Sequence, residues 1–193
     1  MKVQALTGDL IEDALEDVAH LRITVFREWP YLYDGDLDYE RRYLHAYKKS
    51  SQGIVVGAYD GDWLVGASTG APLAEHSAEF AGAFNGADLD VSRVFYCGES
   101  VLLPSYRGRG VGKAFFDLRE DHAKSHGFTQ ICFCAVMRPD DHPLCPENYR
   151  PLDGFWESRG YAPLAGVVAS FDWKDLNQVR ETRKPLQFWM RDL

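Results

Sequence analysis

The chain has 193 residues, of which 46% are hydrophobic and 26% charged, with a formal net charge of −8. This composition is typical of a globular protein with a full core and argues against intrinsic disorder. The acidic balance argues against nucleic acid as a partner, because binding phosphates needs a basic face, and no apolar run approaches the about 18 residues of a membrane span. The first residues lack the layout of a signal peptide, so we expect a single cytoplasmic domain over residues 1–193.

Hydrophobic periodicity predicts strands and helices along the whole chain. Helices are marked by apolar residues at helical spacing, and strands by short runs of β-branched and aromatic residues. The segments expected first are a strand at 3–6, helices at 11–25 and 37–48, a hairpin of 53–59 with 63–68, and an inserted short helix and loop at 72–90 with a turn at Asn85-Gly86. The later ones are strands at 94–97, 101–103, 130–136, 166–173 and 186–190, and a helix from Val111 that carries Lys113, Asp117, Arg119 and Glu120 between its apolar positions. The first helix has Thr7 or Asp9 as its expected N-cap.

A glycine-rich stretch, Arg107-Gly108-Arg109-Gly110-Val111-Gly112, lies between a predicted strand and a predicted helix. Such a turn directs unpaired backbone N–H groups and the positive end of a helix dipole at one point, which suits a phosphate. A P-loop would need four residues between its glycines and then Lys-Ser/Thr, but Lys113 is followed by Ala114. A dinucleotide fingerprint would need G-x-G-x-x-G, whereas these glycines read G-x-G-x-G. We therefore predict another kind of phosphorylated ligand; the alternative is a plain turn with exposed arginines.

The same stretch resembles the acyl-CoA loop of the GNAT acyltransferases, whose signature is Gln/Arg-x-x-Gly-x-Gly/Ala after a strand. Arg107, Gly110 and Gly112 occupy its three fixed places. A second block, which ends at 155–161, resembles the family's short helix ending in Phe-Tyr-x-x-x-Gly-Phe/Tyr. The resemblance is strong over residues 94–162. It implies an α/β fold with a central mixed sheet and helices on both faces, and an N-acetyltransferase activity.

The resemblance also implies a ligand and where it lies. Acetyl-CoA would be the acyl donor, with no metal required, and a primary amine of a small molecule or peptide would attack it directly in a ternary complex. The pyrophosphate would lie on the glycine-rich loop, and the pantetheine arm would pair like an added strand where the fourth strand splays from its neighbour near Leu102. The cofactor-binding residues implied in this way are Val101, Leu102, Leu103, Arg107, Gly108, Arg109, Gly110, Val111, Gly112 and Lys113.

Glu99 is the candidate base for the proton of the attacking amine. It stands three residues before Leu102, where many members of the family carry an acidic residue beside the acetyl group. A carboxylate on an otherwise apolar strand face is costly unless it is paired or functional. The alternative is an ion pair with an arginine or a place at the splayed edge. The apolar residues expected on the same face are Phe95, Cys97, Val101 and Leu103.

The general acid is where the sequence departs from the family pattern. Trp156 holds the place of the usual tyrosine, and an indole N–H can donate a hydrogen bond but does not deliver a proton to sulfur. Tyr149 is the candidate substitute, with a plain loop tyrosine as the alternative. We interpret Trp156 as a residue of the core or of the cofactor packing. This departure leaves a non-catalytic acyl-CoA-binding or regulatory module of the same fold as the second hypothesis.

Two segments are expected to border the acceptor. Residues 137–151 form a long, proline-rich connection, interpreted as a substrate lid or homodimer contact or, alternatively, as an inert stiff loop. In residues 29–39, Asp34, Asp36 and Asp38 lie among aromatic residues and could hold an ammonium group. The alternative for these aspartates is helix capping over a solvated turn.

Overall fold

The computed structural model describes residues 1–193 except 77–79, 81, 85 and 140. Strands and helices alternate much as the periodicity predicts, and the turn predicted at Asn85-Gly86 falls partly outside the described residues. The helices are α1 (Asp9–Phe26), α2 (Leu37–Lys49), α4 (Val111–Ser125) and α5 (Asp153–Ser158). The strands are β1 (Lys2–Leu6), β2 (Ile54–Asp60), β3 (Trp63–Pro72), β4 (Val94–Tyr96), β5 (Ser100–Leu102), β6 (Gln130–Val136), β7 (Ala162–Trp173) and β8 (Thr182–Asp192). Short 3-10 turns lie at Leu73–His76, Val91–Arg93 and Pro104–Tyr106.

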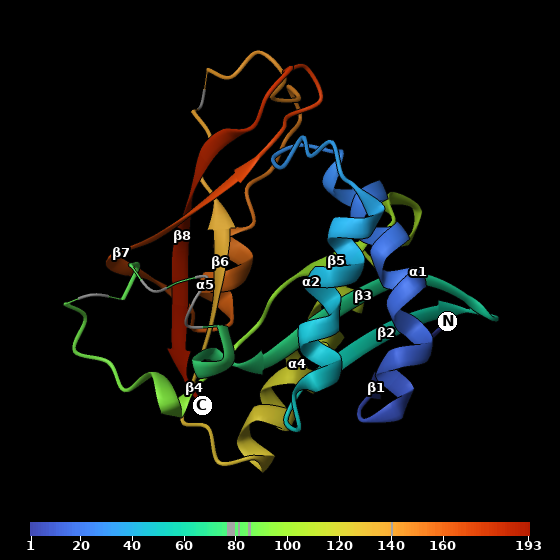
Figure 1. Ribbon diagram of the computed structural model, residues 1–193, viewed down its shortest axis with the longest axis vertical. Helices are drawn as coiled ribbons and strands as arrows, with labels where there is room; N and C mark the ends of the chain where they lie inside the picture. The colour runs from blue at the N-terminus through green and yellow to red at the C-terminus, as the bar shows by residue number, and fades with distance from the viewer. Residues whose placement is uncertain (77–79, 81, 85, 140) are drawn as a thin grey trace.

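The strands form one mixed sheet in the order β1-β2-β3-β4-β6-β8-β7, with β5 paired to β3 beside β4. Pairing is antiparallel except between β4 and β6, which run parallel. Figure 1 shows α1 and α2 in front of the β1–β3 half, α4 behind it, and α5 behind β6. This arrangement confirms the predicted α/β fold with helices on both faces.

The first two helices follow from their apolar spacing. In α1, Ile11, Val18 and Leu21 are buried against the sheet, as the periodicity predicts. The predicted N-cap is wrong: Gly8, at φ 58°, precedes the helix, so the left-handed turn of a glycine starts it. In the described part of the chain, none of the helices combines the length and the apolar character needed to cross a membrane.

The fourth strand is broken into β4 and β5. Its last bond to the neighbouring strand runs from Cys97 N to Cys132 O at 2.8 Å, and β5 pairs only with β3 among the described strands. The separation therefore begins five residues earlier than the predicted position near Leu102. The predicted common face is also wrong, because Val101 packs with α1 and α2 while Phe95 packs with α4. A strand that breaks loses the alternation from which that face was predicted.

Gly98 lies at the break, where other groups come close to the backbone. A Cβ atom at Gly98 would overlap the hydroxyl oxygen of Tyr47 and would come within 2.7 Å of Thr69 Oγ1. Tyr47 is fully buried, so it has little room to move away. The tyrosine of α2 thus occupies the space that a side chain at this position would need.

Arg119 secures the other side of the break, although the helical pattern places it between the apolar positions of α4. It is 2% exposed, and its Nη1 donates to the Glu99 carbonyl at 2.9 Å and to the Thr69 carbonyl at 3.3 Å. Its Nη2 donates to Ser100 Oγ at 3.0 Å. Glu120 is buried too, bonded to Arg159 and Tyr161. Arg119 and Glu120 were expected on the polar face of the helix, but both are buried, because long side chains can reach polar groups inside the fold.

We predict that Gly98→Ala destabilises the protein by about 1–3 kcal/mol or more, the range of overpacked cores. Chemical denaturation of the purified variant measures this loss. In a Tyr47→Phe background the hydroxyl is gone, so the same alanine should cost measurably less. If Gly98→Ala lowers the free energy of unfolding equally in both backgrounds, the Tyr47 hydroxyl is not the reason that position 98 requires glycine.

Candidate functional site

The glycine-rich loop ends in an open helix N-terminus. Gly108 and Gly110 adopt φ values of 74° and 82°, a left-handed conformation that favours glycine. Ala114 N donates to Gly110 O at 3.1 Å, which closes the first turn of α4 and leaves the three preceding N–H groups without intrahelical acceptors. Within the described residues no side chain caps this end, and its first turn has no acidic residue. The dipole and the N–H groups therefore favour an anion.

The loop also leaves room for a ligand to approach. A Cβ atom on Gly108, Gly110 or Gly112 would meet no described atom within 4 Å beyond its own chain neighbours. Gly112 is helical, so neither its φ nor packing within the described chain requires glycine there. The missing side chain is explained if a phosphate lies against the backbone, so the loop fits the diphosphate group of a CoA compound.

The two arginines of the loop are bonded within the protein. Arg107 Nε donates to the Leu102 carbonyl at 3.0 Å, and its Nη2 lies 2.8 Å from Glu28 Oε2. Arg109 donates to the Ser105 carbonyl at 2.8 Å. They shape the loop in this structure, and their predicted bonds to a ligand would need other rotamers.

The separation from β6 leaves one edge of β5 without a strand partner in the described chain. Leu103 N donates to Val65 O at 3.0 Å, and Thr69 N to Glu99 O at 3.2 Å, so these groups face β3. Alternation directs the backbone groups of Leu102 to the opposite edge, where Arg107 reaches its carbonyl. The predicted pairing of an extended arm with this edge stays a prediction, and Arg107 would compete with it for the carbonyl.

Glu99 lies at the break, buried and ion-paired. It is 6% exposed, and its Oε2 is 2.5 Å from Arg22 Nη1 and 3.4 Å from the Tyr43 hydroxyl. Arg22 Nε also pairs with Glu40 Oε2. The predicted alternative of an arginine partner is therefore correct, but the arginine is shared between two carboxylates.

The environment of Glu99 favours its taking a proton. Burial raises the pKa of its carboxyl group above the usual value, while the positive charge of Arg22 lowers it and the negative charge of Glu40 raises it again. The Thr69 side chain lies close enough to lower this pKa by hydrogen bonding, but Oε1 is buried and has no hydrogen bond of regular geometry among the described residues. Such a weakly bonded carboxylate oxygen can accept a proton, which is what a base requires.

Trp156 and Tyr149 both have aromatic neighbours of their own. The Trp156 ring is half-buried and packs against Phe133 and Trp189, with centroids 5.0 and 5.1 Å apart, at the border of the core, which agrees with the interpretation as a residue of the core or of the cofactor packing. Tyr149 is 37% exposed and packs edge-on against Trp29 at 5.9 Å. No hydrogen bond or ring contact found in the described chain joins Tyr149 to Glu99.

Arg138 joins three connections, those between α1 and α2, between β6 and α5, and between β7 and β8. The sequence did not single out this arginine. Its guanidinium donates to the carbonyls of Pro30 and Tyr31 at 2.8 and 2.6 Å and to both oxygens of Asp175 at 2.8 and 3.0 Å. Trp173 Nε1 donates to the Tyr31 carbonyl as well, at 3.1 Å. The loop at 137–151 is thus tied to the α1–α2 and β7–β8 connections. The only signal in the sequence was an arginine two residues after a strand, at the start of a long loop.

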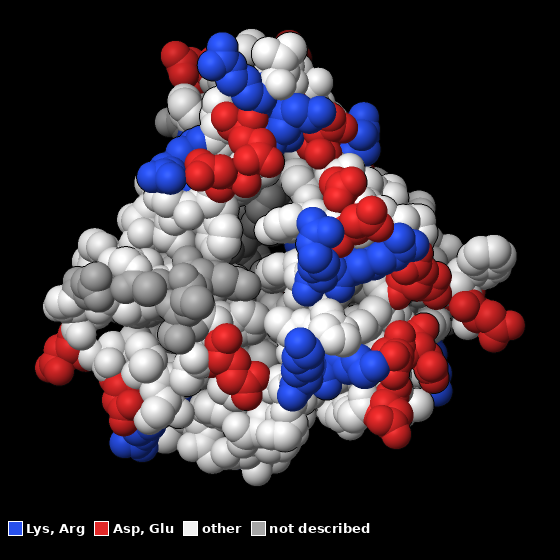
Figure 2. All heavy atoms as spheres, viewed as in Figure 1, with Lys and Arg blue, Asp and Glu red and all other residues white. Residues whose placement is uncertain are grey.

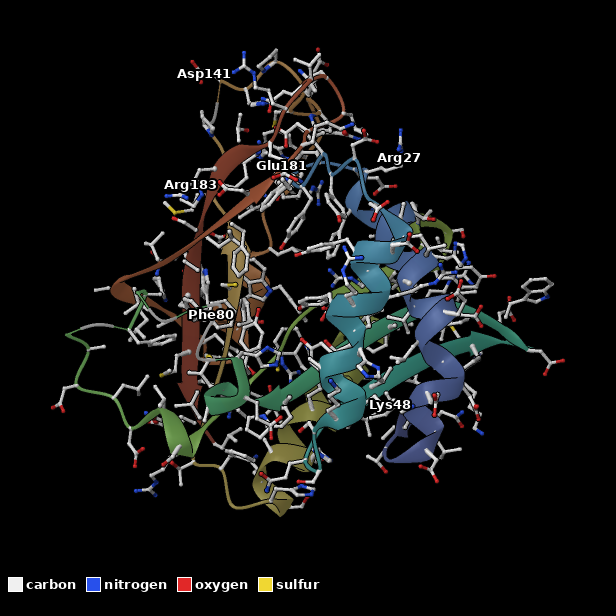
Figure 3. All side chains as sticks on the ribbon, in the orientation of Figure 1. Arg27, Lys48, Phe80, Asp141, Glu181 and Arg183 are labelled. Carbon is white, nitrogen blue, oxygen red and sulfur yellow. The ribbon has the colours of Figure 1, made fainter. Side chains whose placement is uncertain are left out.

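These connections border a hollow in the surface. Figure 2 shows it between the half that holds β6–β8 and the half that holds α1 and α2, with charged side chains of both signs at the end formed by the three connections. Figure 3 shows Arg27 and Asp141 projecting outward at that end, and Phe80 over the face of β6 and β8. The geometry therefore places the two segments expected to border an acceptor beside this hollow.

The three aspartates of the α1–α2 connection are engaged within the protein. Asp36 caps α2 by accepting from Tyr39 N at 2.8 Å. Asp34 pairs with Lys174 at 2.5 Å, and Asp38 with Arg41 at 3.1 Å. The capping alternative is correct for Asp36, and none of the three carboxylates has been left as a dedicated ammonium site.

Comparisons with known proteins agree with this geometry. Residues 17–146 match the model of the acetyltransferase (GNAT) family. No curated protein matches the chain significantly. Among solved structures, ribosomal-protein-alanine N-acetyltransferase from Brucella melitensis is 11% identical, with a TM-score of 0.63 over 100% of both chains.

Two further structures were solved with CoA compounds. An aminoglycoside 6'-N-acetyltransferase complexed with coenzyme A is 18% identical, with a TM-score of 0.59 over 100% of this chain and 97% of that chain. The protein yncA from Salmonella typhimurium, with its cofactor acetyl-CoA, is 11% identical, with a TM-score of 0.59 over 100% and 95%. These likenesses show the fold, and the family match spans well over half of the sequence. The chain belongs to the GNAT acetyltransferase family.

Proposed function

We propose that this protein transfers an acetyl group from acetyl-CoA to a primary amine of a small molecule or peptide. The observation that carries the proposal is the open N-terminus of α4 directly beside the broken strand, with three uncommitted N–H groups and a glycine that no packing explains. The CoA compounds in two similar structures support the same donor. The reaction would take place in the cytoplasm, with the 137–151 loop as a substrate lid or a homodimer contact.

The chemistry requires a neutral amine, because a protonated nitrogen has no lone pair for attack. Glu99 is the proposed base: the ammonium proton passes to its carboxylate, the nitrogen attacks the thioester carbonyl carbon, and the C–S bond breaks. The nitrogen, positively charged after the attack, loses a second proton to water as the amide forms, and the thiolate takes up a proton as it leaves. Trp156 does not supply it, so Tyr149 or water serves as the proton donor in this proposal.

The alternative is a non-catalytic acyl-CoA-binding or regulatory module. It is favoured by one observation, the tryptophan in the place of the family's tyrosine, half-buried against two aromatic rings of the core. Release of CoA measured with a panel of amines distinguishes the two. Release no faster than spontaneous hydrolysis, in a protein that acetyl-CoA stabilises against heat, would support the module.

We predict that Gly112→Ala weakens acetyl-CoA binding about tenfold or more, a loss of about 1.4 kcal/mol, because a methyl group would stand between the backbone and the phosphate. The free protein should keep or slightly raise its Tm, since alanine is the better helix former. Isothermal titration and thermal unfolding measure the two effects.

Gly154→Ala is the matched control for that substitution. Gly154 also lies in a helix, and a Cβ atom there would meet no described atom within 4 Å either. Its alanine variant should bind acetyl-CoA as the original protein does. An unchanged dissociation constant in Gly112→Ala would remove the loop from the proposed donor site.

We predict that Glu99→Gln lowers kcat/KM by about 10²–10⁴-fold, the usual contribution of a general base. In the original protein, activity should be present above the pKa of Glu99 and be lost as the pH falls through it. Because burial raises that pKa, the acidic limb should lie above the ordinary range of a glutamate.

The pH dependence of kcat/KM for both proteins checks this prediction. Glu12→Gln, at an exposed carboxylate that pairs with Lys48, is the matched control and should keep the profile of the original protein. A Glu99→Gln variant with full activity across the pH range would rule out Glu99 as the base.

A further inference from the structure

The carboxylate of Glu99 belongs to a buried group of three side chains from three elements. Arg22 of α1 lies between Glu40 of α2 and Glu99, and the three are 8%, 0% and 6% exposed. Arg22 Nε contacts Glu40, and Nη1 is 2.5 Å from Glu99. One cation thus serves two carboxylates. A buried excess of negative charge costs stability, so a purely structural ion pair would not need the second carboxylate.

Contacts with two aromatic rings also position the guanidinium of Arg22. Its guanidinium lies over the rings of Tyr43 and Phe26, at 4.4 and 5.0 Å from their centroids, and is held between the two carboxylates. The two acids use different nitrogens of one rigid planar group. A change in the charge of one acid therefore alters the field that the other experiences.

One other cation lies near Glu99. Arg119 of α4 donates to the backbone carbonyl of Glu99, and its charge lowers the pKa of the carboxyl group, but less than the charge of Arg22 does. The titratable and charged groups that face Glu99 are Arg22 from α1, Tyr31 from the α1–α2 connection, Glu40, Tyr43 and Tyr47 from α2, Cys97 from the broken strand and Arg119 from α4.

We propose that Glu40 is a positioning residue that governs how readily Glu99 takes a proton, acting through the arginine that the two carboxylates share. This inference rests on the proposed function of Glu99 as the base. Without Glu40, Arg22 would pair with Glu99 alone and hold it as an ionised, weakly basic carboxylate. With Glu40, the attraction of Arg22 is divided, and Glu99 stays basic enough to accept the proton of an ammonium group.

The two members of the group should act in opposite directions. Removing the charge of Glu40 removes a repulsion, so the pKa of Glu99 falls. Removing Arg22 removes an attraction, so the pKa of Glu99 rises. Loss of packing or of general stability does not predict opposite signs for the two substitutions.

The experiment uses Glu40→Gln, which keeps an oxygen for Arg22 Nε but no charge. The pKa of Glu99 is read from a ¹³C NMR titration of the glutamate carboxyl carbons, with the Glu99 signal assigned by its absence in Glu99→Gln. We expect this pKa to fall by about one unit, and the acidic limb of the pH profile of kcat/KM to move to lower pH with it. The plateau of kcat/KM should drop a few fold, because Glu99 is then a weaker base.

Glu16→Gln is the matched control, since it breaks an exposed α1–α2 pair with Arg41 and should change neither the NMR pKa of Glu99 nor the pH profile.

The two readouts distinguish the two proposals. An unchanged NMR pKa of Glu99 in Glu40→Gln would overturn the inference about Glu40, whatever the activity. A lowered NMR pKa with an unmoved pH–rate profile would support the coupling but would contradict Glu99 as the base. Arg22→Gln gives a second test where it folds, because a Glu99 pKa that did not rise would also contradict the shared arginine. Glu40→Gln keeps the inference testable if that variant does not fold.

Discussion

The break of the fourth strand at Gly98 is the constraint on which the rest of the site depends. Tyr47 from α2 occupies the space beside Gly98, and Arg119 from α4 donates to the carbonyl of Glu99 after the break and to that of Thr69 in β3. Because the strand ends its pairing with β6 at Cys97, it gains a free edge beside the glycine-rich loop and can carry a charged residue inside the sheet. A continuous strand would have closed that edge with backbone hydrogen bonds.

The same break explains how a carboxylate can be tolerated in the core. Glu99 leaves the alternation of the sheet and meets a guanidinium held between two aromatic rings. A full neutralisation would have made it an inert ion pair, but Arg22 is shared with Glu40. The negative charge of Glu40 favours proton uptake by Glu99, but burying that charge costs stability.

The border of the proposed acceptor site is organised by a different arginine. Arg138 gathers carbonyls from the α1–α2 connection and a carboxylate from the β7–β8 connection, so three loops that are far apart in sequence act as one wall. The small-molecule or peptide amine of the proposed function would meet a preformed surface rather than three independent loops. Buried bonds of this kind restrict movement because an unpaired guanidinium would be left behind.

The sequence by itself determined the features that are local in the chain. The helices and strands follow from their periodicity, and the loop at 107–112 follows from glycines whose conformations need no distant partner. Only the tertiary structure decided the break at Gly98, the burial of Arg119, the division of Arg22 between Glu40 and Glu99, and the role of Arg138. Each of these depends on atoms brought together from separate elements. The pKa of a buried group and the free-energy cost of adding a side chain both depend on neighbours in space, and these neighbours cannot be read from the order of residues along the chain.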